Sequence, residues 1–206
     1  MRPFFYRAMH ATGGFTITEL LSVSVILVIF FAAFFGSYSV LRHQTYQQGN
    51  FYDADRSVRF AVDRVARDVN EALSVVASYG TYNTGDNTLV LALPGINTNG
   101  EPTNIETDFD RVIYRLDPGD STVFQRILSL DASSQRNGGN DATQVVSREV
   151  QNILFSSGGT GLSEISVVNT LKRINFSISA RKTLRGGAQT QTAGLDSDMT
   201  LRNKFD

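Results

Sequence analysis

Residues 13–35 read GGFTITELLSVSVILVIFFAAFF, two glycines followed by an apolar run with one acidic residue, Glu19, near its start. Residues 15–35 form a run of about 21 residues, long enough as a helix to cross a hydrocarbon core of roughly 30 Å. Arg2 and Arg7 precede the run without any acidic residue, and a basic flank of this kind stays in the cytoplasm. The sequence therefore predicts a membrane-spanning helix that carries the rest of the chain to the outer side.

Glu19 is the exception within this run, because a carboxylate in hydrocarbon is costly even on lenient insertion scales. A buried carboxylate is tolerated mainly when it is paired with a cation. The sequence therefore predicts a positively charged partner for Glu19.

Residues 14–19, GFTITE, resemble the class III signal of type IV prepilins, in which Gly is followed by Phe-Thr and by Glu at the fifth mature position. In that family a membrane aspartyl protease cuts after the glycine, methylates the new N-terminus and leaves the apolar segment on the mature protein. The resemblance implies that residues 1–14 are a cleaved leader, with Gly14 the cleaved residue and Phe15 the N-methylated mature N-terminus. An ordinary secretory signal peptide would instead be cut after its apolar region, and it would give Glu19 no role.

The same resemblance supplies a partner for Glu19. In the family, Glu19 of an incoming subunit would meet the free amine of Phe15 on a neighbour already in the filament, so that this charge pair sets the axial register. Phe15 and Glu19 are thus the implied assembly residues. The implied partners are other pilin or pseudopilin subunits, the prepilin peptidase, an inner-membrane assembly platform and the membrane itself.

The helix is predicted to continue beyond the membrane span, since no proline follows Phe35 until Pro94. Over residues 58–76 apolar side chains recur at steps of three and four, and charged side chains occupy the other face, which predicts an amphipathic helix packed on a sheet. We expect the helix to end near Tyr79, with Gly80 as its C-terminal cap.

Beyond Gly80 the chain becomes rich in Gly, Asn, Thr and Asp between short alternating runs, which is typical of strands joined by turns. Strands are predicted at residues 87–93, 109–116, 122–130, 145–155, 164–168, 172–180 and 199–203, and polar loops at 95–108, 134–142 and 186–198. The sequence DPGD at residues 117–120 predicts an antiparallel hairpin. The predicted fold class is α+β and pilin-like, with a long N-terminal α-helix packed on an antiparallel β-sheet.

Few residues in the chain suit catalysis. The only histidine after residue 14 is His43, there is no cysteine, and neither a phosphate-binding loop nor a nucleophile elbow is found in the sequence. Asp196 and Asp198 offer oxygen ligands of the kind that calcium prefers, but solvated turns are the preferred interpretation. We therefore expect no enzyme activity, cofactor or metal site, and the formal net charge of −1 leaves no basic footprint for nucleic acid.

Two further segments narrow the resemblance. The segment VDRVARDVNEA, with Arg64, Arg67, Asp68 and Ala72, and the hairpin sequence at residues 112–127 are similar to those of PilW-type minor pilins and of J-type minor pseudopilins of type II secretion. Major type IV pilins usually have a disulfide-bounded C-terminal loop and a proline at the twenty-second mature position, where this chain has Gly36 and no cysteine. A minor or secretion-type subunit is therefore the closer resemblance.

The resemblance implies a structural minor subunit of a type IV pilus or a type II secretion pseudopilus, assembled through its N-terminal helix in a tip or initiation complex. It would be a single-pass protein of the bacterial inner membrane, with residues 36–206 forming the domain outside the cytoplasm. The alternative is a membrane-anchored extracytoplasmic binding or adhesion protein that uses the pilin signal only for delivery.

Overall fold

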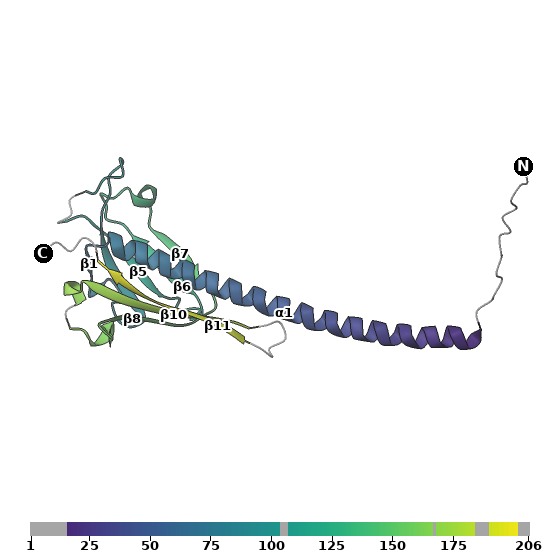
Figure 1. The fold of residues 1–206 in the computed structure, drawn as a ribbon. Coiled ribbons are helices and arrows are strands. Elements are labelled where there is room, and N and C mark those ends of the chain that lie inside the picture. The colour runs from purple at the N-terminus through teal and green to yellow at the C-terminus, as the bar shows by residue number, and fades with distance from the viewer. Residues whose placement is uncertain (1–15, 104–106, 167, 184–189, 202–206) are drawn as a thin grey trace, which may run out of the picture. The chain divides into compact units, whose positions relative to one another are not determined.

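The computed structural model describes residues 16–103, 107–166, 168–183 and 190–201 (Figure 1). It has an α+β fold in which one long N-terminal helix, α1 (Ile17–Glu71), precedes a series of antiparallel strands. The chain divides into two compact units, Met1–Tyr46 and Gln47–Asp206. Helix α1 contributes residues to both units and is continuous through Gly36 and Gly49.

In the first unit, the apolar part of α1 is not buried by any other described part of the protein. Its serine hydroxyls near the start of the helix bond to the helix itself. Ser22 Oγ donates to the carbonyl of Thr18 at 2.8 Å, and Ser24 Oγ donates to the carbonyl of Leu20 at 2.7 Å. A helix that bonds its polar groups internally in this way is suited to a medium without water.

In the second unit, the amphipathic face predicted for residues 58–76 is confirmed up to the end of the helix. Val58, Val62, Val65 and Val69 are all buried in the core. Valine is a mediocre helix former, so burial against the sheets rather than intrinsic propensity stabilises this part of α1.

The predicted helix end near Tyr79 is wrong, because α1 ends at Glu71. The backbone N–H of Leu73 already donates to the carbonyl of Ala92 at 2.8 Å, and β1 (Ser74–Val75) pairs antiparallel with β4 (Thr88–Pro94). On this strand Val75 is fully buried. The helical spacing of apolar residues continues past Glu71, but the backbone groups of residues 73–75 bond to β4 in the sheet.

Gly80 is therefore not a helix cap. It lies in the two-residue loop between β2 (Ser78–Tyr79) and β3 (Tyr82–Asn83), which form a small antiparallel hairpin. Its φ is +58°, and glycine adopts this left-handed conformation without the steric penalty that other residues incur.

The first sheet has five strands in the order β1-β4-β5-β6-β7. Strands β4, β5 (Phe109–Leu116) and β6 (Phe124–Ser129) confirm three of the predicted strands, and β5 and β6 form the predicted antiparallel hairpin. The edge strands are β1 and, at the other side, β7 (Ala142–Ser147), which pairs with β6.

The second sheet has the order β11-β10-β8-β9. Its strands are β8 (Val150–Ser157), β9 (Thr160–Gly161), β10 (Arg173–Thr183) and β11 (Thr190–Thr200). In β10 the predicted alternation is confirmed, since Ile174, Phe176 and Ile178 are all buried. A single sheet was expected from the sequence, whereas the strands divide between two larger sheets and the small hairpin.

Three strand predictions in this half were wrong in whole or in part. The expected strand at 145–155 is broken at Glu149, whose φ of +58° ends β7 in one sheet before β8 begins in the other. The expected strand at 164–168 is replaced by the 3₁₀ helices η2 (Leu162–Glu164) and η3 (Val168–Thr170). The expected loop at 186–198 is wrong from Thr190 onward, because β11 runs from Thr190 to Thr200. The expected strand at 199–203 is confirmed only at its first two residues, and residues 202 and 203 lie outside the described part of the chain.

One hydrophobic core joins α1 to both sheets, and Figure 1 shows the C-terminal part of α1 lying along their strands. A row of stacked rings crosses this core. Tyr114 and Phe124 from the first sheet lie 5.7 Å apart, Phe124 lies 5.6 Å from Phe176, and Phe176 lies 4.8 Å from Phe155 of the second sheet, centroid to centroid. Offset aromatic pairs of this kind add to the stabilisation from burial, so the row holds the two sheets together.

A buried charge pair fixes α1 on the first sheet. Asp68 of α1 accepts hydrogen bonds at Oδ2 from Arg126 Nε of β6 and, at 2.6 Å, from the hydroxyl of Tyr114 on β5. Burial, and then the Asp68 carboxylate, raises the pKa of Tyr114 well above its ordinary value, so the phenol stays protonated and donates. Both charged side chains are nearly inaccessible to solvent. Each charge is therefore compensated by the other rather than by water.

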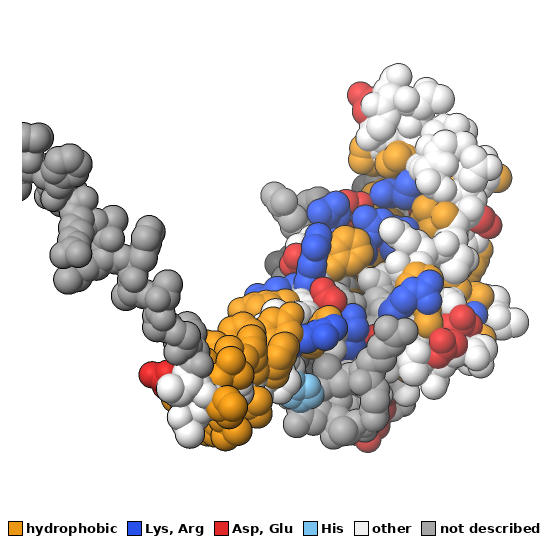
Figure 2. Space-filling view, turned by 90° about the vertical axis from the view of Figure 1, so that its right-hand side faces the viewer, with side chains coloured by type: hydrophobic (Ala, Val, Ile, Leu, Met, Phe, Trp, Pro, Cys, Tyr) orange, Lys and Arg blue, Asp and Glu red, His pale blue; other side chains and the backbone are white. Residues whose placement is uncertain are grey.

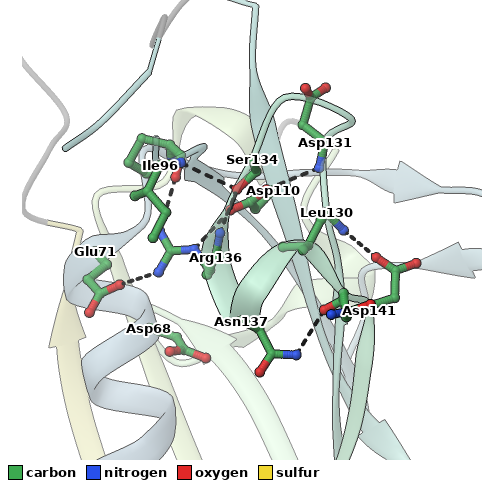
Figure 3. A network of polar contacts seen from close by, with 12 residues as sticks. Asp68, Glu71, Ile96, Asp110, Leu130, Asp131, Ser134, Arg136, Asn137 and Asp141 are labelled. Carbon is green, nitrogen blue, oxygen red and sulfur yellow. Dashed lines mark hydrogen bonds and ion pairs between the residues drawn. The ribbon is translucent and has the colours of Figure 1, made fainter. Parts of the chain in front are cut away.

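A second network connects the end of α1 with the 3₁₀ helix η1 (Arg136–Gly139) (Figure 3). Arg136 donates from Nε to Asp110 at 2.9 Å, and its guanidinium also bonds Glu71 at 3.2 Å and the carbonyl of Pro94 at 3.0 Å. Asp110 is fully buried and also accepts from Ser134 Oγ at 2.9 Å. The irregular segment around η1 is thereby held against both α1 and the first sheet.

The buried pair gives a stability prediction. Arg126→Met should lower the free energy of unfolding by about 3–5 kcal/mol, because it leaves the Asp68 carboxylate buried without its cation. Urea unfolding of the full chain in detergent micelles, followed by near-ultraviolet circular dichroism, measures the change. The control is Arg59→Met, which breaks the exposed pair between Arg59 and Asp55 on the same helix and should leave the midpoint unchanged. Equal effects of the two substitutions would contradict the assigned role of the buried pair.

Candidate functional site

The start of α1 carries three reciprocal hydrogen bonds between Thr16 and Glu19. Glu19 Oε2 accepts from the backbone N–H of Thr16 at 2.9 Å and from the Thr16 hydroxyl at 2.9 Å, while the Glu19 N–H donates to Thr16 Oγ1 at 3.3 Å. This is a capping box, in which the side chains of the N-cap residue and of the third helical residue satisfy each other's backbone donors. The carboxylate is also placed at the positive end of the helix dipole, where negative charge is stabilised.

The capping box uses one oxygen of the carboxylate. Among the described residues the Glu19 hydrogen bonds involve Oε2, and Oε1 makes none. Gly14 and Phe15, the predicted cleavage residues, lie outside the described residues. Oε2 lies 2.9 Å from the nitrogen of Thr16, so the carboxylate is held at the first residue of the chain that the structure describes.

Thr16 was not singled out from the sequence as a functional residue. The signal was present, because Thr-x-x-Glu before an apolar run is the signature of a capping box. The structure adds an acceptor role that Glu19 has within its own chain.

Beyond the capping box, α1 presents a continuous apolar surface, seen as the hydrophobic side chains behind the acidic tip in Figure 2. No charged residue lies between Glu19 and Arg42, and large side chains such as Phe30 and Phe35 are more than 60% exposed. The helix is long and apolar enough to cross a membrane. A contiguous exposed apolar surface of this kind marks a site of membrane or protein interaction.

Of the two aspartates considered as calcium ligands, Asp198 lies 4.0 Å from Arg173. Within the part of the chain that the structure describes, no group of three or more His, Cys, Asp or Glu side chains is arranged to hold a metal ion.

Comparisons with known proteins give no assignment: no family model, curated protein or solved structure matches the chain.

The capping box predicts a local effect of Thr16→Val, which keeps the shape of the side chain but removes its hydroxyl. Because an N-cap contributes about 1 kcal/mol, amide hydrogen exchange at Glu19 and Leu20 should become about fivefold faster in micelles. The amides of Val62 and Val65 serve as internal references and should not change. The matched control is Thr18→Val, whose hydroxyl contacts only the Thr16 hydroxyl among the described residues; the same acceleration in this variant would contradict the capping role.

Proposed function

We propose that this protein is a structural, non-enzymatic minor subunit of a type IV pilus or a type II secretion pseudopilus. On this proposal, residues 1–14 are removed by a prepilin peptidase, Phe15 becomes the N-methylated N-terminus, and the subunit enters a filament from the bacterial inner membrane through α1. The observation that carries the proposal is a single carboxylate, Glu19, in the first turn of an uncovered apolar helix, with one oxygen bonded to Thr16 and the other unengaged by the described residues.

The geometry supports a charge pair with an amine at this end of the helix. A carboxylate in hydrocarbon needs a cation or several donors, and the capping box supplies two donors to Oε2. Oε1 remains for the amine of Phe15 on a neighbouring subunit. Glu19 would then stabilise its own helix start and join two subunits at the same time.

A place in a tip or initiation complex is supported by the irregular surface of the second unit. The segments at residues 95–103 and 130–141 contain turns, an isolated bridge and η1 rather than regular strands. A principal subunit must repeat one heterologous contact along the whole filament, whereas a terminal subunit contacts unlike partners. Irregular segments are more easily accommodated in a terminal subunit than in a repeated one.

Processing gives the first test of the proposal. In cells that contain a prepilin peptidase, intact-mass analysis of the membrane-extracted protein should show an N-terminus at Phe15 carrying one methyl group. Gly14→Ala should block the cut, because the protease of the resembled family cleaves after glycine, and Gly13→Ala is the matched control that should still be processed. A mature N-terminus beyond Phe35 would contradict the proposal.

Filament entry tests the role of Glu19. Glu19→Gln keeps an acceptor for the capping bonds but removes the charge, so it should be processed and inserted normally and yet be strongly depleted from sheared filaments, as quantified by mass spectrometry. Thr16→Val weakens the cap but keeps the charge, and should enter filaments far better than Glu19→Gln. The wild-type protein should be a trace component relative to the principal subunit. Normal incorporation of Glu19→Gln would overturn the charge-pair mechanism, and abundance equal to the principal subunit would overturn the minor role.

A further inference from the structure

A polar groove of about 370 Å³ lies between the C-terminal part of α1 and the edge of the first sheet. We call it the arginine groove, because Arg64 and Arg67 of α1, Arg126 of β6 and Arg136 of η1 all line it. Gln144 of the edge strand β7 forms its other side. Figure 3 shows part of this region, with Asp68 and Glu71 of α1 on one side and η1 on the other.

The four arginines differ in what they already bind. Arg126 is paired with Asp68, and Arg136 with Asp110 and Glu71. Arg64 and Arg67 form no ion pair with any described residue, and the Nε atom of Arg64 is shielded from solvent without a hydrogen-bond acceptor among them. A buried donor left without an acceptor is costly. The groove therefore has an excess of positive charge and an unsatisfied donor, which an anion would correct.

The strand beside the groove is an open edge. β7 is the last strand of the five-stranded sheet, and its central residues Thr143, Gln144 and Val145 are exposed. Its sequence, ATQVVS, contains neither a charged residue nor a proline, and these are the features by which edge strands usually avoid pairing with other chains. The edge strand β11 of the second sheet, by contrast, carries Asp196 and Asp198. β7 combines an unprotected edge with a neighbouring groove whose positive charge suits an acidic ligand.

We propose that an extended acidic segment of a partner protein adds to β7 as a sixth strand of the first sheet and places a carboxylate in the arginine groove, against Arg64 and Arg67. Main-chain hydrogen bonds to an exposed strand supply affinity in this mode of recognition, and side-chain pockets supply specificity. Arginine is well suited to the second task, because its planar guanidinium can bind a carboxylate through two parallel hydrogen bonds.

The edge strand favours a peptide over a free phosphate or carboxylate. A small anion would satisfy the arginines but would leave the exposed edge of β7 unpaired, whereas a strand with one acidic side chain fills both sites. The inference goes beyond the proposed filament role and does not depend on it, because it concerns residues of the second unit alone.

Peptide binding to the full chain in detergent micelles tests the inference directly. The probe is a fluorescein-labelled peptide, Thr-Val-Glu-Val-Thr-Thr, together with variants that move the glutamate along the sequence, and fluorescence anisotropy reports binding. We expect a salt-sensitive complex with at least one of these peptides. Replacing the glutamate by glutamine should weaken that complex at least about tenfold, because a charge-assisted bond is lost. Methylating alternate backbone nitrogens, which keeps the charge but blocks strand pairing, should weaken it to a similar degree.

Substitutions in the groove provide the reciprocal test. Arg64→Gln and Arg67→Gln should each lower the affinity for the glutamate peptide by about tenfold and leave the affinity for the glutamine peptide unchanged. Arg59→Gln is the matched control, since it removes the same charge from an exposed site on the same helix and should have no effect. Circular dichroism verifies that each variant is folded.

Three outcomes would overturn the inference. They are no binding of any glutamate peptide, equal binding of the N-methylated peptide, and equal binding to the double variant Arg64→Gln/Arg67→Gln. The second would show a charge contact without strand addition, and competition of that contact by inorganic phosphate would assign the groove to a small anion instead.

Discussion

The first half of α1 exposes apolar side chains that no described part of the protein covers. The medium around this surface, water or hydrocarbon, decides which backbone conformation is stable there. In hydrocarbon, a single segment is stable only if its backbone donors and acceptors bond internally, which a helix achieves and an isolated strand does not. The serine hydroxyls at positions 22 and 24 follow the same rule, since each bonds a carbonyl one turn earlier. The start of the helix has no earlier turn, and the bonds between Thr16 and Glu19 satisfy its first groups instead.

The second half of the same helix is stabilised by a different partner. Its valines are buried against two sheets, and its orientation on them is set by Asp68, which reaches Arg126 and Tyr114 on neighbouring strands. Burial alone does not fix the rotation of a helix on a surface, whereas a buried charge with two defined partners does, because any other rotation leaves an ion unpaired. The helix then ends where the backbone of Leu73 finds an acceptor in β4.

The sequence predicted those elements whose signals are local. The membrane-compatible run, the valine face up to Val69, the hairpin β5–β6 and the alternation in β10 are all confirmed, because each depends on a repeated spacing or a turn signal within a few residues. The errors arose where distant pairing overrides local pattern. Residues 72–76 continue the helical spacing but bond to β4, and the break at Glu149 is imposed by the assignment of β7 and β8 to different sheets. At the candidate site, the motif predicted the importance of Glu19, while the arginine groove depends on residues more than 50 positions apart and has no local signal.

The groove also shows how helix geometry separates charges that are adjacent in sequence. Arg67 and Asp68 are neighbours in the chain, yet successive side chains on a helix point about 100° apart, so Asp68 faces the sheet while Arg67 remains exposed. Arg64 lies one turn before Asp68 and is placed for an i, i+4 contact, but the described bonds of Asp68 go to Arg126 and Tyr114. The fold therefore satisfies its buried acids with arginines from other elements, and Arg64 and Arg67 of the helix form no ion pair with a described residue. Among the described residues, the positive charge of Arg64 and Arg67 therefore lies beside β7, an edge strand that carries no charged side chain.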